Sequence, residues 1–369
     1  MFAAEIYSEE LSLAHQRGYP IPNPQNSRVT DPGLGAREVP QPCATIGDVG
    51  YIAPYTNNFY RLFNIHLKPG VDGQPGAECL PKGFKPMPMG GVIREVARKP
   101  FYASQNVSVQ VEDADAGSKG TTGYKVTARG RGACLITPDP VEVYDAVDID
   151  SYKRYARLHM LGWYKHVRDE LGHDIKLEDL MLVTGVDLTT SWATAVIEER
   201  DTNATLHLKV RHARVDESQL VTEFAWLNQP ACTTVTSGPA RGSIRMANTA
   251  KPAGIDVSGR PAVVPLNAAC DQQIFVRHIR ATTRQQWNRP GDKYYDSEDS
   301  DDEGDLQIIV NDGQRHRFTD CLQPALNYIF ENSAANVAIA HYEDLTLLRG
   351  AESGLNPALT VEDGIGMLE

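Results

Sequence analysis

The pattern of apolar and polar residues between residues 150 and 211 predicts a helix, a buried strand and two alternating segments. In SYKRYARLHMLGWYKHVRDELG, apolar residues recur every three or four positions, which is the period of one helix face. That face carries Ala156, Met160, Trp163, Val167 and Leu171. Asp148 or Asp150 can cap the start of the helix, and Gly172 suits the position after its last turn. Gly162 lies in the middle of the helix, where we expect a close neighbour to account for it.

Strict alternation marks the segments that we expect to form two long antiparallel hairpins. The first has arms at 106–112 and 123–136, and the second has arms at 191–200 and 205–212, joined by a polar DTNA turn. In each hairpin one face is apolar and the opposite face is rich in basic residues. The candidate contact residues on the basic faces are Lys125, Arg129, Arg131, Lys209 and Arg211.

The other apolar runs complete an α+β fold with a twisted antiparallel sheet and the central helix packed on it. Strands are expected at 180–186, 220–227 and 273–281, and a strand–helix–strand unit close to the C-terminus. Buried core residues are expected to include Trp163, Leu180, Leu182, Trp192 and Phe275. The predicted organisation is an N-terminal helix with a proline-rich arm (1–44), a core domain (45–285), an acidic linker (286–305) and a C-terminal β-α-β unit with a loosely ordered tail (306–369).

Charge and composition narrow the class of protein. The net charge of −12 argues against nucleic-acid binding. Seven acids lie within 296–305, so the rest of the chain carries −12 + 7 = −5. We expect this acidic run to be an exposed loop, with Ser297 and Ser300 as candidate phosphorylation sites. Six widely spaced cysteines, no secretory signal and no apolar run long enough to form a transmembrane helix predict a cytoplasmic protein.

The sequence assigns no catalytic residue and no cofactor. It lacks the GxSxG, HExxH, CxxC and P-loop motifs. The glycines of RGRG at 129–132 lie within a strand pattern, so no helix follows them to hold a phosphate. His159, His166 and His173 are each seven residues apart, which is roughly 10 Å of helix rise and too far to share a metal ion. Asp187, His159, Asp174 and Cys134 would form a site only if the fold brought them together.

The chain resembles a large family of proteins of unknown function from mushroom-forming (basidiomycete) fungi. The resemblance lies in GDVGYI, FYRLFNI, GACLITPDP, WYKHVRDELG, LMLVTGVDLTTSWATAV, IFVRHIRA and NVAIAHYEDL, in this order. These segments cover roughly residues 45–345, and several of them are specific. Membership of that family does not by itself imply a function.

A more distant likeness concerns the order of elements. A long hairpin, a helix, the strand LMLVTGV, a second hairpin and the late strand IFVRHIRA occur in an order similar to that of the gasdermin pore-forming domain. This likeness covers roughly residues 45–285. The basic membrane-binding helix of gasdermins has no counterpart in residues 1–44, where the helix carries Glu5, Glu9 and Glu10.

Three hypotheses follow from these observations. The gasdermin likeness implies a pore-forming protein of fungal cell death or defence, restrained until a protease or another trigger releases it. Its partners would be anionic membrane lipids, the activating protease and further copies of itself, and it would move from the cytoplasm to the membrane on activation. The second hypothesis is a non-enzymatic cytosolic binding protein, and the third is an enzyme of unknown reaction. A pore former requires that the apolar faces of the hairpins carry no charge, whereas an enzyme requires a deep polar pocket.

Overall fold

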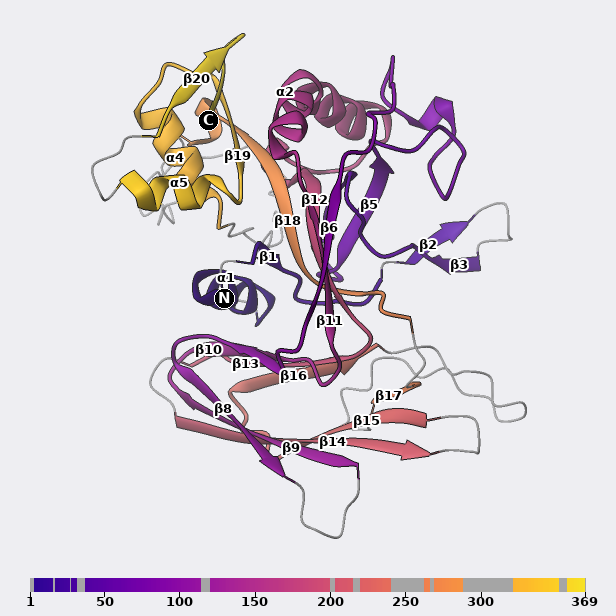
Figure 1. The fold of residues 1–369 in the computed structure, drawn as a ribbon, viewed down its shortest axis with the longest axis vertical. Coiled ribbons are helices and arrows are strands. Elements are labelled where there is room, and N and C mark those ends of the chain that lie inside the picture. The colour runs from indigo at the N-terminus through magenta and orange to yellow at the C-terminus, as the bar shows by residue number, and fades with distance from the viewer. Residues whose placement is uncertain are drawn as a thin grey trace, which may run out of the picture.

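The computed structural model describes residues 3–15, 17–26, 28–31, 37–113, 120–199, 203–214, 220–239, 262–265, 269–287, 321–351 and 357–368. These residues form an α+β fold of mixed and antiparallel sheets with few helices, which confirms the α+β part of the predicted fold class. Figure 1 shows one large sheet with α2 and the C-terminal helices around it, and two further sheets stacked below. We name these three layers the main sheet, the inner sheet and the outer sheet.

The main sheet contains ten strands, which come from the start, the middle and the end of the sequence. Its principal order is β20 (Leu359–Glu362), β21 (Ile365–Leu368), β19 (Val337–His341), β18 (Gln272–Thr283), β12 (Met181–Thr189), β11 (Val141–Ala146) and β6 (Val92–Ala97). Three further strands join it, with β1 (Tyr19–Pro20) on β18, β4 (Asp48–Ile52) on β12 and β5 (Phe59–Asn64) on β4. The pair β19–β21 is parallel, so this sheet is mixed. A separate two-stranded ribbon consists of β2 (Arg28–Asp31) and β3 (Arg37–Pro40).

The inner and outer sheets are two layers with the same strand order. The inner sheet has the order β16 (Thr233–Gly238), β13 (Trp192–Ile197), β10 (Gly132–Ile136) and β7 (Phe101–Ala103). The outer sheet has the order β17 (Ala262–Pro265), β15 (Leu220–Leu227), β14 (Asn203–Arg214), β9 (Thr121–Arg129) and β8 (Val107–Asp113). Each inner strand is next along the chain to its counterpart in the outer sheet, in the pairs β16–β15, β13–β14, β10–β9 and β7–β8. Strand β17 has no counterpart in the inner sheet. The chain crosses between the two layers at 104–106, 130–131 and 228–232, and we name this set of crossings the crease.

Because the chain changes sheets at the crease, the two predicted hairpins are wrong in part. The first hairpin exists only between β8 and β9, because the arm expected to reach residue 136 breaks at Gly130 and continues as β10 in the inner sheet. Gly130 has φ +95°, which glycine adopts at low cost, and it turns the chain through the corner. The arms 191–200 and 205–212 do not pair with each other. β13 pairs with β10 and β16, whereas β14 pairs with β9 and β15.

The helices are α1 (Ala3–His15), α2 (Ile149–Lys165), α3 (Arg284–Trp287), α4 (Gln323–Glu331) and α5 (Asp344–Ala351). Short 3-10 turns occur at Ala77–Cys79 and Leu177–Asp179, and a π-turn at His166–Glu170 extends α2. Asp148 caps α2, because its side chain accepts a hydrogen bond from the amide of Ser151. Gly172 has φ +73° just after the π-turn, as predicted for the end of this helix. The expectation for Gly162 is wrong, since no atom outside its own helix lies within 4 Å of a Cβ built there.

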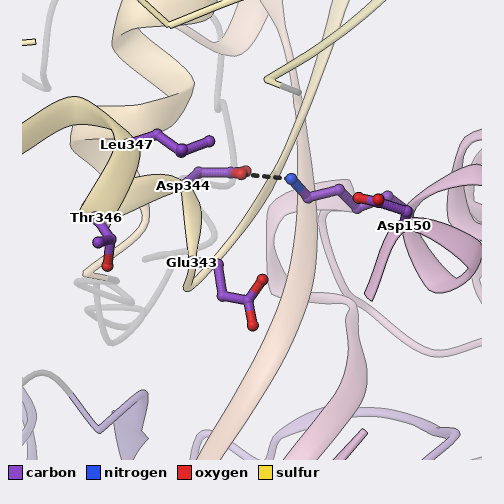
Figure 2. A pocket seen from close by; sticks show the side chains of 6 residues that line it. Asp150, Glu343, Asp344, Thr346 and Leu347 are labelled. Atoms are coloured by element: carbon purple, nitrogen blue, oxygen red, sulfur yellow. Dashed lines mark hydrogen bonds and ion pairs between the residues drawn. The ribbon is translucent and has the colours of Figure 1, made fainter. Parts of the chain in front are cut away.

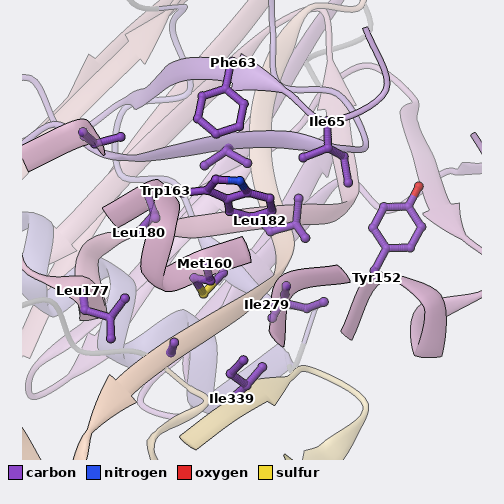
Figure 3. Packing of buried hydrophobic residues seen from close by; sticks show 14 of the residues in the cluster. Phe63, Ile65, Tyr152, Met160, Trp163, Leu177, Leu180, Leu182, Ile279 and Ile339 are labelled. Carbon is purple, nitrogen blue, oxygen red and sulfur yellow. The ribbon is translucent and has the colours of Figure 1, made fainter. Parts of the chain in front are cut away.

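The apolar face of α2 packs on the main sheet. Figure 3 shows Trp163 and Met160 of α2 against Leu180 and Leu182, with Phe63 beyond them. The Trp163 and Phe63 rings meet edge to face, with centroids 5.7 Å apart. The five core residues predicted from the sequence are each at most 3% exposed, so this prediction is confirmed.

Both ends of the chain pack on these layers. Helix α1 lies between the main sheet and the inner sheet, where Ile6, Tyr7 and Leu11 join a buried cluster with Leu135 and Phe275. At the other end, β19 pairs with β18, so the C-terminal unit extends the main sheet. The tail expected to be loosely ordered contains the hairpin β20–β21. Its turn residues Asp363 and Gly364 both have positive φ, as in the Asp-Gly turns that favour two-residue hairpins.

Candidate functional site

The exposed face of the outer sheet brings together four of the five predicted basic residues. In β9, Tyr124, Val126 and Ala128 point inward and are buried, whereas Lys125 is half-buried and Arg129 exposed. In β14, Leu206, Leu208 and Val210 point inward, whereas Lys209 and Arg211 are exposed. The two strands are neighbours, with His207 opposite Lys125 and Asn203 opposite Arg129. Alternation on paired strands therefore places these four cations on a single face.

Two glutamates reduce the charge of this face. Glu223 on β15 is directly opposite Arg211, and Glu112 on β8 lies 3.8 Å from the ring of His207. Four cations and two carboxylates leave a formal charge of 4 − 2 = +2 with neutral His207. The face is therefore a modest positive patch on a chain whose net charge is −12.

Arg131 does not lie on this face. It follows the corner at Gly130, and its side chain is 15% exposed. Its guanidinium forms ion pairs with Glu9 at 2.9 Å and Glu10 at 3.0 Å, both on α1. The glycines of RGRG were the sequence signal for this corner. Arg131 therefore holds α1 against the end of the inner sheet.

The buried face of the outer sheet carries no charged side chain among its described core residues. It packs against the inner sheet in a cluster formed by Val107, Tyr124, Val126, Ala128, Cys134, Ile136, Ala193, Ala195, Ile197, Ala204, Leu206, Leu208, Val210 and Phe224. Burial raises the pKa of the Cys134 thiol to about 12. A thiol in these surroundings stays protonated at neutral pH and is a core residue rather than a nucleophile.

The other residues considered for catalysis have separate surroundings. Asp187 is fully buried in the main sheet and accepts hydrogen bonds of 2.7 Å from Arg17 and Arg277. His159 lies on α2, where its ring stacks on Trp163 with centroids 6.0 Å apart. Cys134 lies between the inner and outer sheets. Asp174, the fourth candidate, is exposed in the segment that follows the π-turn, so the fold gives these side chains no common site. Ser297, Ser300 and the acidic stretch 296–305 lie outside the residues that the structure describes.

A pocket of about 380 Å³ lies where α2 meets α5. It is lined by Asp150, Lys153, Glu343, Asp344, Thr346 and Leu347. Figure 2 shows Asp344 pointing across the pocket, and the dashed line from it marks the ion pair with Lys153. The Nζ of Lys153 donates to Asp344 Oδ1 at 2.5 Å and to the carbonyl of Leu368 at 3.1 Å.

The buried polar groups of this pocket already satisfy one another. Asp344 also accepts the amide of His341, whose ring contacts Thr184 at 2.8 Å. Burial raises the pKa values of Asp344 and Glu343, and burial lowers the pKa of His341 well below its usual value. Because Lys153 binds both Asp344 and the carbonyl of Leu368 in β21, it joins α2 to the C-terminal unit. Nothing in their geometry holds a reactive group free for a substrate.

Comparisons with known proteins do not assign this chain to a family. No protein-family model matches the chain, no curated protein matches it, and no solved structure matches it. Across the described residues, no cluster of three or more His, Cys, Asp or Glu side chains could hold a metal ion. In the same part of the chain, no helix is both long and apolar enough to cross a membrane.

Proposed function

We propose that this protein is a membrane-active, pore-forming protein that binds anionic lipid through the exposed face of the outer sheet. The supporting observation is the contrast between the two faces of that sheet. One face carries Lys125, Arg129, Lys209 and Arg211, and the other packs its apolar side chains on the inner sheet, with a polar His212–Thr222 pair toward the end of β14. Inserted strands need this combination, with apolar side chains toward lipid and polar ones toward water.

Strand length also supports the proposal. A membrane-spanning strand needs about 9–11 residues. β9 has 9 residues and β14 has 12, and they are adjacent in the outer sheet. The inner sheet is a poorer candidate, because its central strands β10 and β13 are buried on both faces. We therefore assign insertion to the outer sheet and a supporting role to the inner sheet.

Electrostatic attraction alone would give weak, reversible binding. Each Lys or Arg near an anionic surface contributes about 1 kcal/mol, so four contribute about 4 kcal/mol before the two glutamates are subtracted. Binding at that strength corresponds to millimolar affinity. Durable attachment would require the apolar face of the outer sheet to leave the inner sheet and enter lipid, together with further copies of the protein.

In this proposal, the protein is kept inactive by the packing contacts that hold the outer sheet in the folded structure. α1 holds the inner sheet through Arg131, and the C-terminal unit is held on α2 through Lys153 and Arg157, which pairs with Glu362. Cleavage within 286–305 by an activating protease would separate the C-terminal unit covalently from the rest of the chain. A role in cell death or defence would follow from leakage of the membrane.

The test is binding and dye release with vesicles of anionic or neutral lipid, using full-length and proteolysed protein. Lys125→Glu with Arg129→Glu should reduce binding to anionic vesicles by about 10-fold or more while leaving folding intact. Val126→Lys should abolish leakage, because a lysine at a lipid-facing midplane position costs about 2–4 kcal/mol. Its thermal midpoint must be measured as well, since Val126 is fully buried in the folded protein.

A matched control carries the same change in charge elsewhere. Arg154→Glu with Lys165→Glu alters two exposed cations of α2, away from the outer sheet. This control should bind like the parent protein if the outer sheet is the contact surface. If proteolysed, folded protein neither binds nor permeabilises anionic vesicles, the pore-forming proposal is wrong and the cytosolic binding protein is the better hypothesis.

A further inference from the structure

We propose that the free edge of the main sheet, strand β6, is the dimerisation surface of this protein, and that its occupant is β6 of a second copy. Within the described part of the chain, β6 ends the order of the main sheet and pairs only with β11. Such a dimer would form from the folded protein in solution, independently of the proposed membrane activity.

The edge carries exposed apolar side chains on both sides of the charged pair Arg94 and Glu95. Val92 is 38% exposed, Ile93 50% and Val96 58%, and none of them joins a core cluster. Val147, directly after β11 and 59% exposed, lies beside Gly91 and enlarges the patch. β6 contains no proline, and its register with β11 is continuous over all six residues. Proteins usually protect edge strands with prolines, bulges or charges. Of these β6 has only the charges Arg94 and Glu95, and Arg94 is already paired with Glu142, so the exposed apolar side chains around them indicate a partner.

The register identifies which backbone groups are free. The amide of Val147 donates to the carbonyl of Gly91 at 3.0 Å, which makes these opposite residues a hydrogen-bonded pair. Backbone groups in an antiparallel ladder point alternately toward and away from the partner strand. Ile93 and Glu95 therefore bond to β11, whereas the N–H and C=O groups of Val92, Arg94 and Val96 point to the open edge.

Two-fold symmetry then limits the registers open to a second copy, and we propose the one centred at Arg94. In an antiparallel pair related by a two-fold axis, one residue lies opposite its own counterpart. With Arg94 opposite Arg94 of the second copy, Val92 lies opposite Val96 of that copy, and each such pair can exchange two backbone hydrogen bonds. A centre at Glu95 would instead oppose two unpaired carboxylates, and a centre at Val96 would oppose Arg94 to Arg98.

The charge at the centre is already balanced within each copy. The Nη2 of Arg94 lies 2.8 Å from Glu142 Oε1, and its guanidinium lies 5.7 Å from the centre of the Tyr144 ring. The symmetric register therefore brings together two neutral ion pairs, flanked on both sides by valines. This complementarity of β6 with itself favours a second copy over an unrelated extended peptide.

The first experiment measures mass in solution by sedimentation velocity from about 1 to 100 μM. The parent protein should sediment at twice the 40.6 kDa chain mass at the upper concentrations. Val96→Lys should yield a monomer with an unchanged thermal midpoint, because Val96 is already exposed. Val361→Lys is the matched control, since Val361 is 43% exposed on β20 at the opposite edge of the same sheet, and it should leave the dimer intact.

The second experiment tests the register by cross-linking. Arg94→Cys should form an interchain disulfide under mild oxidation, because opposite residues in a ladder have Cα atoms about 5.5 Å apart. Glu95→Cys should not, since its counterpart would be displaced by two residues along the strand. Both variants retain the exposed Cys79, so any background from that thiol appears equally in both. A parent protein that is monomeric at every concentration, or a dimer that survives Val96→Lys, would overturn the proposal.

Discussion

The inner and outer sheets have the same strand order but very different surroundings. β10 and β13 of the inner sheet are buried at every residue, between α1 and the main sheet on one side and the outer sheet on the other. The outer sheet is buried on one face only. One layer therefore has two sets of packing contacts and the other has one. We infer that the outer sheet is the layer that opens at the lower free energy.

The strongest test of this comparison uses the same residue type in each sheet. Trp192 in β13 is 3% exposed, packs in the cluster that includes α1, and donates a hydrogen bond to Gln272. Trp192→Ala should lower the free energy of unfolding by about 3–5 kcal/mol in urea titrations. Trp226→Ala in the outer sheet should cost about 1–2 kcal/mol, because Trp226 is only half-buried. Equal losses in the two variants would contradict the difference between the layers.

The second test breaks the link between α1 and the inner sheet. Arg131→Met removes both ion pairs and leaves Glu9 and Glu10 partly buried without a partner. The free energy of unfolding should fall by about 1–3 kcal/mol. Arg129→Met, two residues earlier on the exposed face, should change it by less than about 0.5 kcal/mol. Hydrogen exchange should show faster opening of α1 in the Arg131→Met variant only. Similar exchange in both variants would show that Arg131 does not hold α1 on the inner sheet.

The third test uses pH at another part of the contact between α1 and the inner sheet. Burial, with Lys99 nearby, lowers the pKa of His15 to about 4. Since the folded pKa is lower than the unfolded value of 6.5, the stability from neutral His15 is present above pH 6.5 and is lost as pH falls toward 4.

Between pH 7 and pH 5, His15→Asn should therefore lose about 1 kcal/mol less stability than the parent, after allowance for the partial exposure of the ring. Asp48, whose pKa burial raises to about 6, contributes the opposite trend, with stability lost as pH rises through 6. Asp48 is present in both proteins, so it cancels in the difference. Parallel pH profiles for the parent and the variant would exclude His15 as the source.

The smallest effect is expected on the exposed face of the outer sheet. Lys209→Ala should change the thermal midpoint by no more than the equivalent of about 0.5 kcal/mol, because exposed cations contribute little to stability. A clear loss of stability would show that this face is covered in solution. That result would move the contact surface away from lipid and toward a protein partner.

The sequence by itself determined the local elements and the faces that they bury. The period of α2, the alternation in β9 and β14, and the apolar runs of β12 and β18 were enough to place Trp163, Leu182 and Phe275 in the core. These features depend on the spacing of side chains along one segment, so they can be predicted without knowing the partner. The edge strand β6 was missed, because an exposed strand lacks the alternation that marks a buried face. The hairpin β20–β21 was also missed, although Asp363-Gly364 carried its turn signal.

Only the tertiary structure decided which strands pair and which charges meet. Residues 123–136 appeared as one continuous arm and 191–200 with 205–212 as the two arms of one hairpin, yet each of these units divides between the two sheets. A strand keeps its pattern whether it continues straight or folds over a corner, so alternation cannot reveal the corner. In the same way, Lys209 and Arg131 look alike in the sequence, but one is solvated and the other binds two glutamates more than 100 residues away. Contacts between distant segments arise from packing the whole chain, and that information is not contained in any single segment.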